Sequence, residues 1–147
     1  RPVDVASKYP VYKISDVNHF EKYNPTVPPS TLMWGWVQMV MVLLFISYLF
    51  ANIADIGAPD MFVYGAFIFL WVYAYTELLD KNRLAWVWET IKNAMGIFIL
   101  LQQGDWFGLG TYISGATTGL FAWFILSTVI TFWLTRQVKE DRKVINA

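Results

Sequence analysis

The chain has 147 residues, of which 56% are hydrophobic, 18% aromatic and only 15% charged. Lys and Arg together number 11, as do Asp and Glu, and Cys is absent. These values exclude a basic protein with nucleic acid as partner, a disulfide-stabilised scaffold and thiolate chemistry. A soluble domain of this size would struggle to bury so much apolar surface, so the composition favours the membrane.

Residues 1–31 form a polar region that contains most of the prolines of the chain. Aromatic residues such as Tyr9 and Phe20 alternate there with charges, which gives the segment something to pack against. We therefore expect 1–31 to be an extended cytoplasmic linker that arrives from an upstream domain. The first residue is Arg1 rather than Met, and we expect the chain to be a segment of a longer protein.

Four long stretches without any charged residue follow, at 23–54, 61–76, 93–104 and 106–135. A helix needs about 20 apolar residues to cross the bilayer, and its backbone must satisfy its own hydrogen bonds there. We expect helices at 32–54, 61–79, 84–102 and 115–135, with Asp60 as the cap of the second helix. The predicted fold class is all-α, a four-helix transmembrane bundle (32–135) preceded by the extended linker and followed by a basic cytoplasmic tail (136–147).

The basic residues indicate the orientation of this bundle. They lie before the first helix, in and just after the second connection, and in the tail, whereas the first and third connections contain none. In a four-pass arrangement all 11 then fall on one side of the membrane. The positive-inside rule assigns that side to the cytoplasm. We therefore expect an integral, multi-pass membrane protein with both termini in the cytoplasm.

Sequence motifs for metal or nucleotide binding are missing. His19 is the one histidine, so we expect no metal and no other cofactor in this segment. The glycine-rich stretch at 104–115 has no phosphate-loop lysine and is interpreted as a hinge. Gly115 and Gly119 have a spacing that allows close helix approach, either within the bundle or in a homo-oligomer.

The candidate site is a group of ionisable residues around the second connection: Glu77, Asp80, Arg83, Glu89 and Lys92. Glu89 and Lys92 share one helical face, about 9 to 13 Å inside the segment that begins near Arg83. Ionisable groups at such depth usually pair or face a protein interior. We expect this group to dock a cytoplasmic domain or to line a substrate entrance. The alternative is that Glu89 and Lys92 extend outwards to the lipid headgroups.

Short segments at 1–11 (RPVDVASKYPV), 36–39 (WVQM), 78–80 (LLD) and 88–90 (WET) suggest a family. Together they resemble the C-terminal membrane region of the alkylglycerol monooxygenase-like branch of the fatty acid hydroxylase/sterol desaturase superfamily. The resemblance implies a parent protein that is a membrane oxidoreductase, with a di-iron centre held by clustered histidines and a lipid substrate. It also points to tetrahydrobiopterin as reductant. The histidine motifs are not in this sequence, so no catalytic residue and no pterin requirement is carried over to it.

The resulting hypothesis is a C-terminal membrane module that anchors and supports an upstream histidine-rich catalytic domain of the same chain, with membrane lipid as the other partner. Two alternatives stay open. One is a free-standing structural subunit of the membrane. The other is a small transporter subunit, which needs polar residues near mid-membrane; only Gln38, Ser47, Thr128 and Thr131 are eligible.

Overall fold

The computed structural model describes residues 27–145 of the chain. This part is helical and contains no strand, which confirms the all-α prediction. The helices, in chain order, are α2 (Pro29–Ala51), α3 (Ile53–Ile56), α4 (Asp60–Leu79), α5 (Ala85–Gln103), α6 (Leu109–Tyr112) and α7 (Ala116–Ile145).

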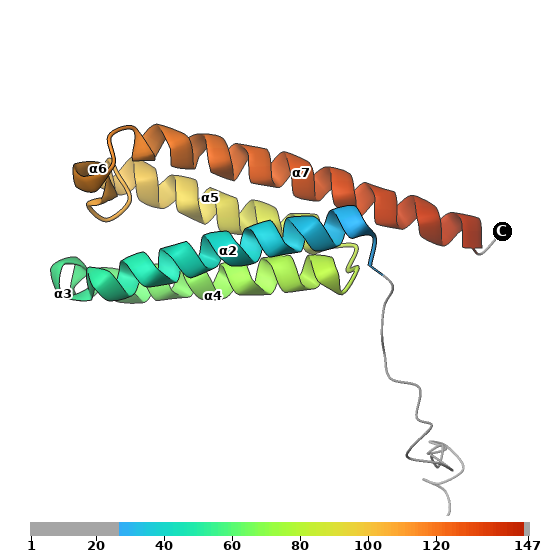
Figure 1. The fold of residues 1–147 in the computed structure, drawn as a ribbon, viewed down its shortest axis with the longest axis horizontal. Helices are drawn as coiled ribbons and strands as arrows, with labels where there is room; N and C mark the ends of the chain where they lie inside the picture. The colour runs from blue at the N-terminus through green and yellow to red at the C-terminus, as the bar shows by residue number, and fades with distance from the viewer. Residues whose placement is uncertain (1–26, 146–147) are drawn as a thin grey trace, which may run out of the picture.

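The four long helices α2, α4, α5 and α7 lie alongside one another and alternate in direction (Figure 1). Backbone packing joins α2 to α4, α4 to α5 and α5 to α7. The short helices α3 and α6 lie at one end of the bundle, called here the α6 end. The start of α2 and the α4–α5 turn lie at the opposite end, called the turn end, and α7 extends beyond it (Figure 1).

Three of the long helices are long and apolar enough to cross a membrane: α2, α4 and the part of α7 from Ala116 to Gln137. This finding supports the prediction of a transmembrane helical protein. The remaining long helix, α5, has 19 residues and is about 28 Å long, which is near the bilayer thickness. Glu89, Lys92 and Asn93 make it more polar than the others, and the structure alone does not assign it to the membrane.

The observed ends of the first and last helices differ from the predicted ones. α2 begins at Pro29 instead of residue 32, because proline is well tolerated in the first turn, where its missing N–H would have no partner. α7 continues to Ile145 instead of ending at 135, because the residues after 135 are strong helix formers without Gly or Pro. The predicted tail is therefore largely helical. Most of the predicted linker, residues 1–26, lies outside the described residues.

The structure corrects one prediction about local structure and one of two alternatives for another. Asp60 is the first residue of α4 rather than its cap, although its charge still complements the helix dipole there. Gly115 and Gly119 make no close contact within the bundle, since a Cβ on either would meet nothing within 4 Å. The close approaches occur at Gly35 and Gly96, where a Cβ would lie 2.8 Å from Leu79 Cδ2 and 2.7 Å from Phe124 Cε2.

Aromatic side chains form the core towards the α6 end. The Trp106 ring centroid lies 4.8 Å from that of Phe67 and 5.1 Å from that of Phe45. Trp106 reaches this position from the loop after α5, where α5 ends at Gly104 with a left-handed backbone (φ 79°). Asp105 accepts hydrogen bonds from the backbone N–H groups that follow it in this loop. The glycine-rich stretch is therefore an ordered connection that holds Trp106 in the core.

Candidate functional site: a polar cluster inside the bundle

The structure separates the five candidate residues into two groups. Asp80 and Arg83 are exposed at the turn end, and Glu77 is half-buried beside them, where it accepts a hydrogen bond from Asn82. Glu89 and Lys92 instead lie inside the bundle, with 1% and 0% of their surface exposed. The candidate site is therefore two sites, one at the end of the bundle and one in its interior.

Glu89 and Lys92 form an ion pair within α5. Lys92 Nζ donates to Glu89 Oε1 at 2.6 Å, across one turn of the helix. The ammonium group also lies over the Trp71 ring of α4, 4.4 Å from its centroid. A cation is attracted to the negative face of an indole, so α4 provides a second, weaker partner for the lysine. The alternative in which the two charges extend to the headgroups does not fit this burial.

A glutamine on α2 connects the ion pair to two other helices. Gln38 Nε2 donates to Glu89 Oε1 and to Ser127 Oγ of α7, each at 3.0 Å. Its side-chain oxygen accepts a hydrogen bond of 2.6 Å from Trp71 Nε1 of α4. Gln38 is fully buried, so all three bonds are made away from solvent. This one side chain therefore joins α2, α4, α5 and α7.

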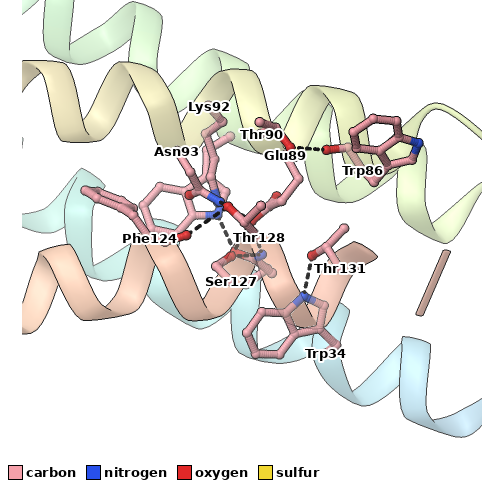
Figure 2. A network of polar contacts seen from close by, with 12 residues as sticks. Trp34, Trp86, Glu89, Thr90, Lys92, Asn93, Phe124, Ser127, Thr128 and Thr131 are labelled. Atoms are coloured by element: carbon pink, nitrogen blue, oxygen red, sulfur yellow. Dashed lines mark hydrogen bonds and ion pairs between the residues drawn. The ribbon is translucent and has the colours of Figure 1, made fainter. Parts of the chain in front are cut away.

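Figure 2 shows the α5 and α7 side of the cluster, where Asn93 and Glu89 lie close to Thr128 and Ser127. Asn93 Nδ2 donates to Glu89 Oε1 at 3.1 Å and to Thr128 Oγ1 at 2.8 Å. Ser127 Oγ donates to the same glutamate oxygen. Glu89 Oε1 thus accepts from Gln38, Lys92, Asn93 and Ser127, a donor set that compensates a buried negative charge. We call these residues, with Trp71 and Thr128, the polar cluster.

Two acceptors in the polar cluster have no donor among the residues that the structure describes. They are Glu89 Oε2 and Asn93 Oδ1. A buried charge is tolerated only when it is paired and hydrogen-bonded, and the cluster meets this condition through one carboxylate oxygen. Removing either charge would leave the other buried and unmatched, so the cluster is expected to fix the relative positions of the four helices.

Most of the partners in the polar cluster were not recognised in the sequence. Gln38 and Thr128 were noted only as polar residues near mid-membrane, and Asn93 and Ser127 were not singled out. Gln38 and Ser127 lie 89 positions apart, so no local spacing reveals their contact. The available signal was that each is a rare polar residue within an apolar helix, where it must find a partner on another helix.

The turn end also contains a small cavity of about 280 Å³ that the sequence did not predict. Arg83 lines it together with Arg136 of α7, Trp86, Phe132 and Thr135. The Arg136 guanidinium lies 4.3 Å from the Phe132 ring centroid. Lys81 of the α4–α5 turn lies at this end together with Arg83 and Arg136, whereas Asp55, Asp60 and Asp105 lie towards the α6 end.

Within the described residues, no group of three or more His, Cys, Asp or Glu side chains is arranged to hold a metal ion. His19 lies outside the described residues. No protein-family model, no curated protein and no solved structure matches this chain. The fatty acid hydroxylase/sterol desaturase resemblance accordingly stays an expectation based on the short segments quoted for it.

Proposed function

We propose that the chain is a four-pass membrane module that anchors and supports the catalytic domain of a lipid oxygenase of the fatty acid hydroxylase/sterol desaturase type. In this proposal the catalytic domain, with its di-iron centre, lies upstream in the same protein. The module itself contributes no reacting group. Its role is to hold that domain at the membrane, where the lipid substrate is found.

The observation that carries the membrane part is the burial of the α5 charges. Glu89 and Lys92 face the other helices and make their contacts there, as do Asn93 and its partners. The outward face of α5 consists of residues such as Ile91, Phe98 and Leu101, which are 45%, 60% and 70% exposed. A helix with this distribution can cross lipid, because its charges are paired within the protein. On this basis α5 is the fourth membrane-spanning helix.

The distribution of charge between the two ends supports the orientation. Four antiparallel spans bring the start of α2, the α4–α5 turn and the end of α7 to the same side. Lys81, Arg83 and Arg136 lie at that end, and the positive-inside rule makes it cytoplasmic. Both termini are then cytoplasmic, so an upstream catalytic domain would be on the same side as Asp80 and Arg83.

The oxygenase part rests on the family resemblance, and a test needs the full-length protein. We would purify it from membranes and measure bound iron and O2-dependent hydroxylation of lipid substrates. Removing charge at the turn end, with Glu77→Gln, Asp80→Asn and Arg83→Gln together, is expected to lower activity severalfold with little loss of stability. Asp55→Asn, at the α6 end, is the matched control and should keep full activity. Undiminished activity in the triple variant would contradict docking at the turn end.

The outcome that contradicts the oxygenase proposal is a full-length protein with no histidine-rich region, no iron and no lipid hydroxylation. The free-standing structural subunit would then be the better interpretation. Tetrahydrobiopterin dependence is measured in the same assay, by comparing activity with and without the pterin.

One observation favours transport as a second function: polar side chains from all four long helices meet inside the bundle. The cluster is, however, closed to solvent in this conformation, and no water-filled path leads from it to either end. None of its residues is more than 2% exposed: Gln38, Glu89, Lys92, Asn93 and Ser127. Reconstituted vesicles with an entrapped pH-sensitive dye separate the two functions. Proton flux that Glu89→Gln abolishes would establish transport, and no flux is expected for the membrane module.

A further inference from the structure

The cavity of about 280 Å³ at the turn end combines positive charge with an aromatic wall. Two arginines from different helices line it: Arg83, which precedes α5, and Arg136 of α7. Both residues are exposed, so a ligand can reach them from outside the bundle. Guanidinium groups bind phosphate through paired, charge-assisted hydrogen bonds. The cavity therefore has the chemistry of an anion site.

Aromatic packing holds one of these guanidinium groups at the cavity. The Arg136 guanidinium lies 4.3 Å from the centroid of the Phe132 ring. Phe132 in turn packs edge-to-face against Trp86 of α5, with 5.6 Å between the ring centroids. A cation that already lies over a ring loses less freedom when it binds a ligand. The contact between α5 and α7 thus positions a hydrogen-bond donor before any anion arrives.

No carboxylate among the described side chains neutralises these two arginines. Within that part of the chain the one salt bridge joins Glu89 to Lys92, inside the bundle. Glu77, at the same end as the cavity, accepts a hydrogen bond from Asn82 instead. Two positive charges that line one small cavity repel each other, and an anion between them removes that repulsion.

The depth of the cavity matches the headgroup level of a bilayer. The part of α7 that is apolar enough to span the membrane ends at Gln137, one residue after Arg136, and α5 begins two residues after Arg83. Because α7 runs towards the turn end, Phe132 lies one turn deeper than Arg136. The wall therefore changes from basic to aromatic towards the bilayer centre, and aromatic side chains such as Trp86 are enriched at this level.

We propose that this cavity binds the phosphate group of an anionic phospholipid of the cytoplasmic leaflet, with Arg83 and Arg136 as the donors. Basic pockets between membrane helices on the cytoplasmic side are typical sites for such headgroups. Trp86 and Phe132 contact the glycerol region of the same lipid. A soluble phosphate would gain nothing from this aromatic wall, which is why the lipid is the favoured occupant. The proposal rests on the membrane placement and orientation argued above but not on the oxygenase role.

The test uses the full chain in a neutral detergent, with native mass spectrometry to count bound lipids. Phosphatidylglycerol and phosphatidylcholine with the same acyl chains are titrated separately, so that the two ligands differ in headgroup. We expect one phosphatidylglycerol to bind about tenfold more tightly than phosphatidylcholine, since each basic residue near the phosphate favours the anionic lipid. Equal affinity for the two lipids would overturn the site.

Single substitutions identify the cavity as the cause. Arg83→Gln and Arg136→Gln should each weaken phosphatidylglycerol binding about fivefold and leave phosphatidylcholine binding unchanged. Lys81→Gln is the matched control, because it removes the same charge from the same end of the bundle but does not line the cavity. Its effect should stay below about twofold. Equal losses in all three variants would show general attraction to a basic surface and would overturn the site.

A competition arm separates the lipid from a soluble source of phosphate. Inorganic phosphate in large excess should not displace phosphatidylglycerol, and displacement would identify a soluble anion as the occupant and contradict the lipid site. Failure of the protein to enter nanodiscs would instead contradict the membrane placement. Arg136 is not among the residues changed to test docking, so Arg136→Gln also distinguishes loss of the lipid from loss of the docked domain.

Discussion

The two halves of the bundle close the space between α2 and α7 by different means. Near the turn end, Trp34 Nε1 donates to Thr131 Oγ1 at 3.0 Å, and Gln38 bonds Ser127, so side chains of the two helices are joined directly. Near the α6 end the same two helices are lined by apolar side chains and leave a pocket of about 510 Å³.

This difference indicates what holds membrane helices together. In lipid, closing an apolar gap gains little, because the hydrocarbon chains around the protein are as apolar as its side chains. Hydrogen bonds between helices do fix their separation, since a polar group without a partner in hydrocarbon is costly. The half with polar residues is therefore closed, and the half without them leaves a pocket between the two helices.

The largest effect is expected from breaking the ion pair in the polar half. Glu89→Gln and Lys92→Met should each lower the free energy of unfolding in detergent by about 3–5 kcal/mol, because each leaves a buried charge unmatched. The double variant should recover part of that loss, since neighbouring residues in one network are not additive. Exposed Asp80→Asn is the control and should cost less than about 0.5 kcal/mol.

Thermal and denaturant unfolding of the four proteins in this cycle gives the coupling energy. A coupling below about 0.5 kcal/mol would mean that the two charges act independently. The ion pair would then not stabilise the half of the bundle that contains the polar cluster.

A smaller effect is expected from crowding the boundary between α5 and α7. Gly96→Ala places a Cβ about 2.7 Å from the Phe124 ring, whose neighbours are themselves packed aromatic side chains. Overpacking of this kind should cost about 1–3 kcal/mol of unfolding free energy. Gly65→Ala on α4 has open space and should be neutral or slightly stabilising. Equal stability of the two variants would show that Phe124 can move aside at no cost.

The smallest effect on stability is expected from replacing one tryptophan in each half of the bundle. Trp34→Phe removes a hydrogen bond between α2 and α7 and should lower stability by about 0.5–1.5 kcal/mol. Trp123→Phe removes a donor that has no acceptor in the described part of the protein, so in lipid-free detergent its loss should be clearly smaller. Unfolding of both variants in the same detergent checks the order. A larger loss for Trp123→Phe would indicate a protein partner for its N–H.

The sequence predicted the long helices well and the site only in part. The predicted helices 61–79 and 84–102 agree with α4 and α5 within one residue at each end, because polar and glycine-containing connections separate the apolar segments. The sequence also placed Glu89 and Lys92 on one helical face, where pairing was one of the open possibilities. The same pattern could not show that this face turns towards Gln38 and Ser127, because such contacts depend on how the helices rotate about their axes.

The glycines illustrate the same limit. Gly115 and Gly119 have the spacing of a helix contact, yet Gly35 and Gly96 make the close approaches. A glycine is needed wherever a large neighbour, here Leu79 or Phe124, faces the backbone, and that neighbour belongs to another helix. The length of α7 was underestimated for a simpler reason. Hydropathy marks the end of the membrane segment, whereas the helix ends where its backbone preferences change.

The central claim is that α5 crosses the membrane with its charges turned inwards. Because the chain has no Cys, single cysteines at Asp80 and Ser114, both exposed and on opposite sides of α5, can be labelled with an impermeant thiol reagent in intact cells. A third cysteine at Ala54, in α3 before α4, serves as reference. We expect Ser114→Cys and Ala54→Cys to label from outside, and Asp80→Cys to label only after the cells are permeabilised. Equal labelling of Asp80→Cys and Ser114→Cys in intact cells would contradict the claim.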